Sequence, residues 1–201
     1  MSYCTWDWST ELDIRYHDEE WGVPVHDDRK MFEHLMLECM QCGLSWELML
    51  QKREIFRACF DGFDYDKIAA YDEADEQRIL GTVGMIRSLP KIRAVINNAR
   101  CYRQVREEFG NFCDYLWAYT DGKTILYQGH GDGKVPVSNY LSEKISKDLK
   151  KRGFKYVGPI TMYSHLQACG LINDHGNDCP CYKRIVENYP VVFKRRYKEK
   201  P

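Results

Sequence analysis

The chain has 201 residues, enough for one large domain or two small ones with a sizeable hydrophobic core. Its 29 Lys and Arg residues almost balance 30 Asp and Glu residues, so the total charge does not indicate a strongly basic nucleic-acid-binding protein. No run of about 18 apolar residues predicts a membrane span, and the polar N-terminus lacks the pattern of a signal peptide. We therefore expect a cytoplasmic protein whose nine cysteines stay reduced.

Helical periodicity covers most of the chain and predicts an all-α fold. The first long helix is expected between an N-cap at Asp27 or Asp28 and a stop at Gly43. Further helices are expected over residues 47–60, 64–71, 72–81, 90–110, 111–119 and 138–152, and another starts near Pro159. Residues 121–137 contain four glycines and are expected to form a surface loop with at most a short extended piece. Residues 183–201 are expected to form a basic tail, frayed at its end.

The clearest helical pattern lies in residues 90–110. Its apolar stripe consists of Ile92, Val95, Ile96, Ala99, Tyr102, Val105 and Phe109. Pro90 stands at the start of this pattern and Gly110 at its end, which are the places that favour these two residues.

Cysteine and histidine spacing suggests a metal site near the two chain ends. Residues 173–182, NDHGNDCPCY, contain His175 and Cys179 in an H-x₃-C pattern, and Cys4 and His17 could supply a second pair. Cys₂His₂ is a closed, structural ligand set for zinc, and such an ion would tie the N-terminal segment to the C-terminal segment. The alternative is a buried Cys4 thiol and an ordinary surface His17. Spacing alone also leaves Cys181 as a competitor of Cys179.

Aromatic side chains gather near the N-terminus and could line a pocket for a planar ligand such as a nucleobase. They are Trp6, Trp8, Tyr16, Trp21 and Trp46. The alternative is a satellite hydrophobic cluster. Glu38 lies in a helix that is apolar nearly all round, beside Met31, Leu35 and Cys42, so the pattern predicts a buried carboxylate that could accept hydrogen bonds from a ligand. The alternative for Glu38 is a position at the edge of the apolar face, reaching water.

Residues 149–158, LKKRGFKYVG, join two predicted helices through a turn with glycine at both ends, Gly153 and Gly158. Phe154 and Val157 can point inward while the turn backbone faces outward. The N-terminus of the second helix presents unpaired N–H groups to a phosphate, and Lys155 lies beside it. Three further basic residues precede the turn, Lys150, Lys151 and Arg152. The pattern resembles a helix-hairpin-helix motif over residues 138–175, which grips a DNA backbone without reading sequence. The alternative is an ordinary pair of antiparallel helices.

Taken together, these stretches resemble the bacterial type I 3-methyladenine DNA glycosylases, which are zinc-containing members of the helix-hairpin-helix superfamily. The stretches that carry the resemblance include CTW at 4–6, YHDEEWGVP at 16–24, LECMQCGLSW at 37–46, LKKRGFKYVG at 149–158 and YSHLQACGLINDH at 163–175. The resemblance covers nearly the whole chain and weakens at 121–140 and after Tyr182. It departs from the family pattern at Asp13, where relatives can carry an aromatic side chain, and at Pro180, which interrupts a run of cysteines.

The resemblance implies a helix-hairpin-helix DNA glycosylase fold, formed by residues 1–201 as a single unit with a zinc site joining the N- and C-terminal segments. One structural Zn²⁺ would be bound by Cys4, His17, His175 and Cys179. Glu38 and Tyr16 would hydrogen-bond an excised base, Trp46 would stack on it, and Trp6 would lie nearby. The DNA backbone would be held by Gly153, Lys155, Val157 and Gly158.

The implied activity is hydrolysis of the N-glycosidic bond of 3-methyladenine in double-stranded DNA, with a flipped-out nucleotide as substrate. Asn173 stands where the wider superfamily has an aspartate, so the resemblance does not identify the general base. Glu38 is the candidate catalytic residue. A monomer without an obligatory protein or membrane partner is expected. The alternatives are a non-catalytic zinc-containing DNA-binding module and a glycosylase of other alkylated bases.

Overall fold

The structure is a computed structural model, and it describes Cys4 and residues 10–195. Its helices are α1 (Glu11–Glu19), α2 (Asp28–Gln41), α3 (Trp46–Cys59), α4 (Tyr65–Ala69), α5 (Glu73–Gly81), α6 (Leu89–Phe109), α7 (Phe112–Trp117), α8 (Tyr140–Lys151), α9 (Pro159–Ala168) and α10 (Pro180–Asn188). Short 3₁₀ turns occur at Asp61–Phe63, Ala118–Thr120 and His130–Asp132, and the strands are β1 (Thr124–Tyr127) and β2 (Val191–Lys194). The fold is therefore mostly helical, as the periodicity predicted.

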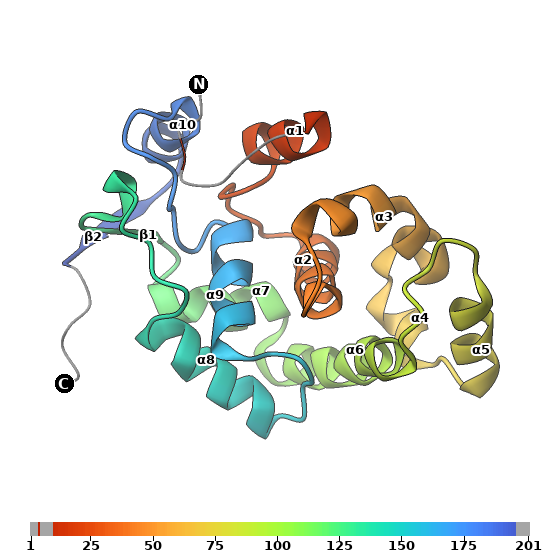
Figure 1. Cartoon of the computed structure of the whole chain (residues 1–201). Helices are drawn as coiled ribbons and strands as arrows, with labels where there is room; N and C mark the ends of the chain where they lie inside the picture. The colour runs from red at the N-terminus through yellow and green to blue at the C-terminus, as the bar shows by residue number, and fades with distance from the viewer. Residues whose placement is uncertain (1–3, 5–9, 196–201) are drawn as a thin grey trace.

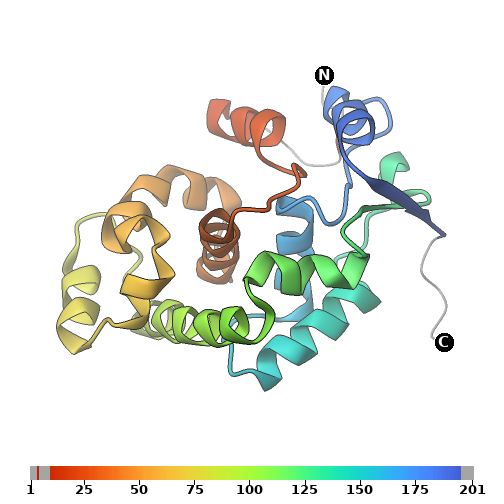
Figure 2. The ribbon, with the colours of Figure 1, turned by 180° about the vertical axis from the view of Figure 1, so that it is seen from behind.

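Helix α2 forms the centre of the fold, with α3, α6, α7 and α9 packed around it (Figures 1 and 2). It begins at the predicted N-cap Asp27, whose side chain accepts a hydrogen bond from the Lys30 N–H at 2.7 Å. The helix is buried from Met31 to Met40, including Glu33, His34 and Glu38. Such all-round burial explains why its apolar residues do not form a single stripe.

Helix α6 agrees with the predicted stripe except at its last member. Ile92, Val95 and the other members as far as Val105 are buried, whereas Phe109 is 42% exposed. Phe109 lies instead under the guanidinium of Arg152, 5.1 Å from the ring centre, in the arrangement of a cation–π pair. The long helix therefore contacts the turn that leads from α8 to α9.

The structure departs from two predictions. The fold is not all-α, because strands β1 and β2 pair in parallel, with Thr124 opposite Val191. The expected basic tail over residues 183–201 is not a tail throughout, because residues 183–188 belong to α10. All four residues of β1 are buried, so the strand shows no alternation of apolar and polar residues from which it could have been predicted. Residues 196–201 lie outside the described part of the chain.

Helix α1 was not predicted, although a local signal for it exists. The Thr10 side chain accepts a hydrogen bond from the Asp13 N–H, and the Asp13 carboxylate receives the Thr10 N–H and hydroxyl, which is a capping box. The same contacts satisfy the Asp13 carboxylate, which is 6% exposed. Arg53 of α3 joins the end of this helix to α2 through ion pairs with Glu20, the C-cap of α1, at 2.8 Å and with Glu33 of α2 at 2.7 Å.

No helix in the described part of the chain is both long and apolar enough to span a membrane.

Candidate active site and metal centre

A cavity of about 40 Å³ lies where α1, α2, α3 and α9 approach one another. Its lining residues are Tyr16, Trp21, Glu38, Gln41, Trp46, Ser164 and Gln167. The structure thus brings together three of the predicted substrate-binding residues, Tyr16, Glu38 and Trp46. The fourth, Trp6, lies outside the described residues.

Glu38 is the carboxyl group of this cavity. The side chain is only 5% exposed, and burial raises its pKa from an ordinary 4.5 to about 8. Among the described residues, no hydrogen bond or ion pair reaches the Glu38 carboxyl oxygens. Burial of a carboxyl group without such partners is unfavourable, and a ligand with N–H groups or positive charge would supply them.

Tyr16 and Trp46 form the aromatic part of the cavity. Tyr16 comes from α1, and its ring centre lies 5.2 Å from that of Trp46, the first residue of α3. Ser45 caps α3 by accepting a hydrogen bond from the Leu48 N–H at 3.3 Å, which fixes where Trp46 begins the helix. Burial and the nearby Glu38 raise the pKa of the Tyr16 phenol, so its hydroxyl stays protonated.

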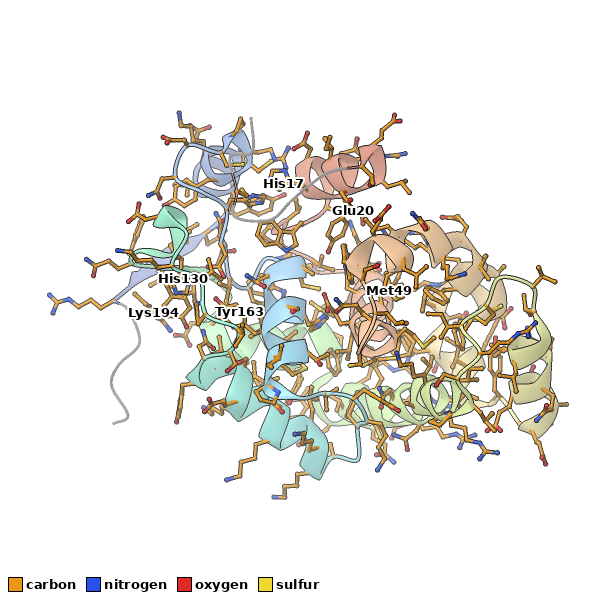
Figure 3. The ribbon with its side chains drawn as sticks, in the orientation of Figure 1. His17, Glu20, Met49, His130, Tyr163 and Lys194 are labelled. Carbon is orange, nitrogen blue, oxygen red and sulfur yellow. The ribbon has the colours of Figure 1, made fainter. Side chains whose placement is uncertain are left out.

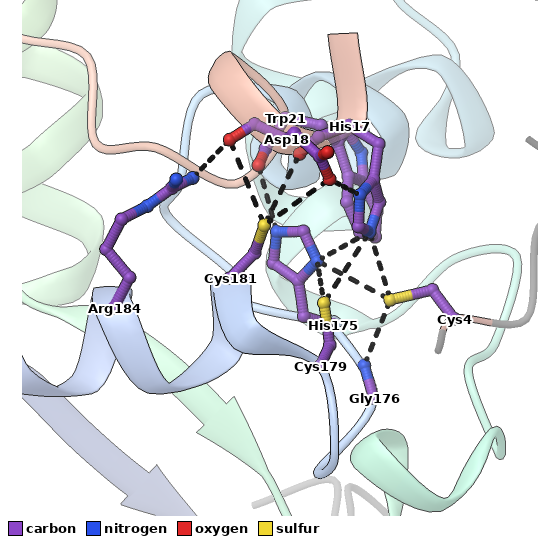
Figure 4. A network of polar contacts seen from close by, with 9 residues as sticks. All are labelled: Cys4, His17, Asp18, Trp21, His175, Gly176, Cys179, Cys181 and Arg184. Carbon is purple, nitrogen blue, oxygen red and sulfur yellow. Dashed lines mark hydrogen bonds and ion pairs between the residues drawn. The ribbon is translucent and has the colours of Figure 1, made fainter. Parts of the chain in front are cut away.

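The predicted ligands Cys4, His17, His175 and Cys179 form a buried cluster next to this cavity (Figure 4). His17 Nε2 lies 3.2 Å from His175 Nδ1 and 3.2 Å from Cys4 Sγ, and Cys4 Sγ lies 3.5 Å from His175 Nδ1. Cys179 Sγ is 3.7 Å from both histidine nitrogens. A tetrahedral ion with Zn–N and Zn–S bonds of about 2.0 and 2.3 Å needs N–N and N–S separations of about 3.3 and 3.6 Å. The four donor atoms therefore fit a single metal ion of this kind.

In each of the two histidines, the ring nitrogen that points away from the cluster has a hydrogen-bond partner, as is usual for histidines that bind a metal. His17 Nδ1 lies 2.8 Å from the Asp18 carboxylate, and His175 Nε2 lies 3.0 Å from the carbonyl oxygen of Trp21. A side chain at Gly22 would approach His175 Nε2 to 2.9 Å, so only glycine leaves room for this packing. Burial lowers the pKa of His175 to about 4, which keeps the imidazole in the neutral form that coordinates metals.

Cys181, the predicted competitor of Cys179, lies on the far side of His17. Its thiol faces the backbone carbonyl oxygens of His17 at 3.8 Å and Asp18 at 3.9 Å. Because Pro180 begins α10, Cys179 is the N-cap and points into the cluster, while Cys181 is already within the helix. The geometry of the four-residue cluster thus favours Cys179.

The predicted DNA-binding residues lie in the turn between α8 and α9, residues 152–158, which we call the hairpin turn. Phe154 and Val157 are buried, as expected, and Lys155 is exposed. Gly153 has a φ of 94° and Tyr156 a φ of 57°, and the left-handed conformation is uncommon for a bulky residue such as tyrosine. Within the described residues, no hydrogen bond is donated by the N–H groups of residues 156–158.

Helix α6 holds the hairpin turn through two asparagines. The fully buried Asn98 accepts a hydrogen bond from the Lys155 N–H at 2.7 Å and donates one to the Lys155 carbonyl at 3.0 Å. Asn97 donates to the Gly153 carbonyl at 2.9 Å. These bonds fix the inner side of the turn and leave its outer side open.

Sequence reasoning missed the polar residues of the cavity, Gln41, Ser164 and Gln167. The spacing of Ser164 and Gln167, three residues apart on one face of α9, is the signal that could have shown them. Asn173 does not join Glu38. It lines a separate cavity of about 370 Å³ beside β1 and β2.

The fold and these sites define a mostly helical protein with an aromatic, carboxyl-containing ligand pocket next to a Cys₂His₂ cluster. Residues 6–182 match the methyladenine glycosylase family, and the chain belongs to this family. It is 46% identical over 182 residues to DNA-3-methyladenine glycosylase 1 of Escherichia coli (strain K12), a match that covers 90% of this chain and 97% of that protein. It is 40% identical to DNA-3-methyladenine glycosylase of Haemophilus influenzae, covering 89% of this chain and 96% of the relative.

Solved structures give the same result. A crystal structure of 3-methyladenine DNA glycosylase I superposes with a TM-score of 0.83 at 47% identity, covering 89% of this chain and 98% of that one. The enzyme of Staphylococcus aureus, studied for the structural basis of its 3-methyladenine recognition, superposes with a TM-score of 0.84 at 33% identity, covering 90% and 96%. The resemblance stated from the sequence motifs is thereby confirmed.

Proposed function

We propose that the protein is a DNA-3-methyladenine glycosylase that hydrolyses the N-glycosidic bond of 3-methyladenine in alkylated double-stranded DNA. It would release the free base and leave an abasic site in base-excision repair. The observation that carries this proposal is the buried Glu38 carboxyl group in an aromatic cavity, without a hydrogen-bond partner among the described residues. Membership of the methyladenine glycosylase family supports the choice of base.

The chemistry of the lesion suits this cavity. Methylation at N3 makes the adenine cationic and a good leaving group, so the enzyme must mainly extract, orient and recognise the nucleotide. A cationic base next to Glu38 lowers the pKa of that carboxyl group and favours the carboxylate. The carboxylate then binds the N–H edge of the base and stabilises positive charge as the sugar gains oxocarbenium character. Trp46 stacks on the base, and Tyr16 contributes its hydroxyl group.

The hairpin turn would bind the DNA backbone. Its contacts are proposed at Gly153, Lys155, Val157 and Gly158, within a helix-hairpin-helix segment over residues 138–175. Support comes from the open N–H groups of residues 156–158, the exposed Lys155 and the dipole of the ten-residue helix α9. These contacts carry no base specificity, so the aromatic cavity selects the lesion.

Zinc is the ion proposed for the cluster of Cys4, His17, His175 and Cys179. Two thiols and two imidazoles are the ligand set of structural zinc, and a fourfold protein coordination leaves no open position for a substrate. When bound, the ion would supply folding energy and no chemistry. Trp21, whose carbonyl faces His175 and whose side chain lines the cavity, links the cluster to the base pocket. We further propose that the chain acts as a single unit and as a monomer.

The proposed activity is tested by incubating the purified protein with DNA treated with a methylating agent and separating the released bases by chromatography. We expect release of 3-methyladenine as the main product. Glu38→Gln should lower single-turnover release by about 10-fold to 1,000-fold while DNA affinity stays within about two-fold, because the substitution removes charge and not DNA contacts. Absence of any released base from the wild-type protein contradicts the proposal. Equal release by the variant removes Glu38 from it.

A further inference from the structure

A buried hydrogen-bond network on the far side of α9 fixes the orientation of one cavity residue. The carboxylate of Asp174 is fully buried and has a partner on each oxygen. Figure 3 labels two of its partners, His130 and Tyr163, which lie near each other. His130 Nδ1 lies 2.7 Å from Oδ1 of Asp174, and the Tyr163 hydroxyl donates to Oδ2 at 2.6 Å. Gln167 Nε2 donates to the same Oδ2 at 2.8 Å. The network therefore joins the 3₁₀ turn at His130 to α9.

The network decides which end of the Gln167 amide faces the carboxylate. If the amide were turned over, its oxygen would lie against the Asp174 carboxylate, and two acceptors at that distance repel each other. Nε2 is thus fixed as the donor to Asp174, and Oε1 lies on the other branch of the planar amide. Gln167 is only 2% exposed and lines the cavity of Glu38. Among the described residues, no hydrogen bond reaches its Oε1.

Two residues that line the cavity can accept a hydrogen bond from a ligand, Glu38 through its carboxyl group and Gln167 through Oε1. A purine with a 6-amino group offers N–H donors at this edge, whereas a 6-oxo purine offers an acceptor. A buried acceptor that faces another acceptor loses its hydrogen bond and is repelled as well, which is the strongest form of discrimination between similar ligands.

We propose that Gln167 is a specificity-determining residue, whose Oε1 accepts a hydrogen bond from the 6-amino group of the bound base and disfavours 6-oxo purines. Asp174 is the positioning residue that holds the amide in this orientation. The inference rests on the proposed function, because it assigns the part of the cavity that distinguishes adenine-type from hypoxanthine- or guanine-type bases.

The test compares two free bases with different groups at position 6, 3-methyladenine with an amino group and 3-methylhypoxanthine with an oxo group, by titrating the tryptophan fluorescence of the protein. The wild type should bind 3-methyladenine at least about ten-fold more tightly. Gln167→Met keeps the side-chain volume but removes the acceptor, so the ratio of the two affinities should fall by about ten-fold. The matched control is Gln51→Met on the exposed face of α3, where both affinities should stay at the wild-type values.

A second variant tests the positioning role. Asp174→Asn retains the size of the side chain but can donate an N–H to Gln167, which allows the Gln167 amide to turn over. The affinity for 3-methylhypoxanthine should then rise relative to that for 3-methyladenine, at unchanged metal content. A loss of stability alone would lower both affinities together.

Two results overturn the inference. One is that the wild type binds both bases equally well, a result that is obtained without any variant. The other is an unchanged affinity ratio in a folded Gln167→Met protein. If the wild type also releases 3-methyladenine from methylated DNA, either result removes only the role of Gln167. A wild type that binds neither base and releases none contradicts the proposed function itself.

Discussion

For Glu38, the sequence predicted the burial of the side chain but not the residues around it. Its position beside Met31 and Leu35 on an all-round apolar helix predicted a buried carboxyl group, and the structure confirms the burial. The residues that share the cavity with Glu38 could not be predicted in the same way. Gln167 and Ser164 line the cavity from α9, and a local sequence pattern does not show which face of a distant helix will pack against α2.

The raised pKa of Glu38 predicts a pH-dependent stability. The folded-state pKa is about 8 and the ordinary value is 4.5, so between these values the folded protein binds more protons than the unfolded chain. The contribution of Glu38 is therefore most favourable below about pH 4.5 and is lost as the pH rises through about 8. Glu38→Gln removes this dependence.

We expect the variant to gain stability relative to the wild type as the pH is raised across this window, by on the order of a few kcal/mol in total. Denaturant unfolding of both proteins at several pH values measures the difference, in which contributions from the metal cluster and other groups cancel. A difference that is constant from pH 5 to pH 8.5 would contradict the raised pKa.

At the scale of elements, the sequence predicted the hairpin turn but not the hydrogen bonds from α6 that hold it in place. The two glycines, the basic residues and the proline at the start of α9 identified the turn from residues 149–159. The bonds from Asn97 and Asn98 that hold its inner side come from α6, more than 50 residues away in the chain. In the sequence these asparagines stand between members of the apolar stripe and do not indicate what they bind.

Lys155 is predicted to contribute to DNA binding without contributing to base recognition. Lys155→Ala should weaken binding to any duplex, methylated or not, and reduce the slope of log K against log salt by about one, because one fewer counterion is released. Affinity for free 3-methyladenine should not change. Fluorescence anisotropy at several salt concentrations measures the slope, with Lys67→Ala on the exposed surface of α4 as control. A uniform loss in both variants would indicate non-specific electrostatics only.

Short elements were the least predictable ones. Strand β1 depends on pairing with β2, and α1 is nine residues long with only its capping box as a signal. Spacing alone could not choose between Cys179 and Cys181. The choice follows from the start of α10 at Pro180, which puts the two thiols on different sides of His17.

At the scale of the whole molecule, the Cys₂His₂ cluster joins the N-terminal and C-terminal segments. Cys4 and His17 contact His175 and Cys179, and the Arg184 guanidinium of α10 donates to the Asp18 carbonyl at 2.6 Å. Figures 1 and 2 show α1 and α10 side by side at one end of the molecule. The central helices have their own core, so the cluster mainly stabilises the part of the molecule that contains Tyr16 and Trp21.

Cys179→Ala and Cys181→Ala are predicted to differ. The first should lose the metal and lower the melting temperature by several degrees, with faster amide exchange in residues 10–22 and 175–188, because an open cluster no longer holds α1 to α10. The second should keep one zinc ion per chain, since the Cys181 thiol is not among the four donor atoms of the cluster and faces the carbonyl oxygens of His17 and Asp18. Elemental analysis and hydrogen exchange of both proteins measure this. Full metal content in Cys179→Ala would contradict the four-residue site.

The position of the cluster has a consequence for biosynthesis. His17 and His175 are separated by 158 positions, so the first two ligands leave the ribosome long before the last two are made. At about 5–20 residues per second, the interval is on the order of ten seconds or more. During this time Cys4 and His17 lack the two C-terminal donors that complete the cluster. The part of the base-binding pocket that contains Tyr16 and Trp21 is therefore stabilised by the cluster only after His175 and Cys179 have been synthesised.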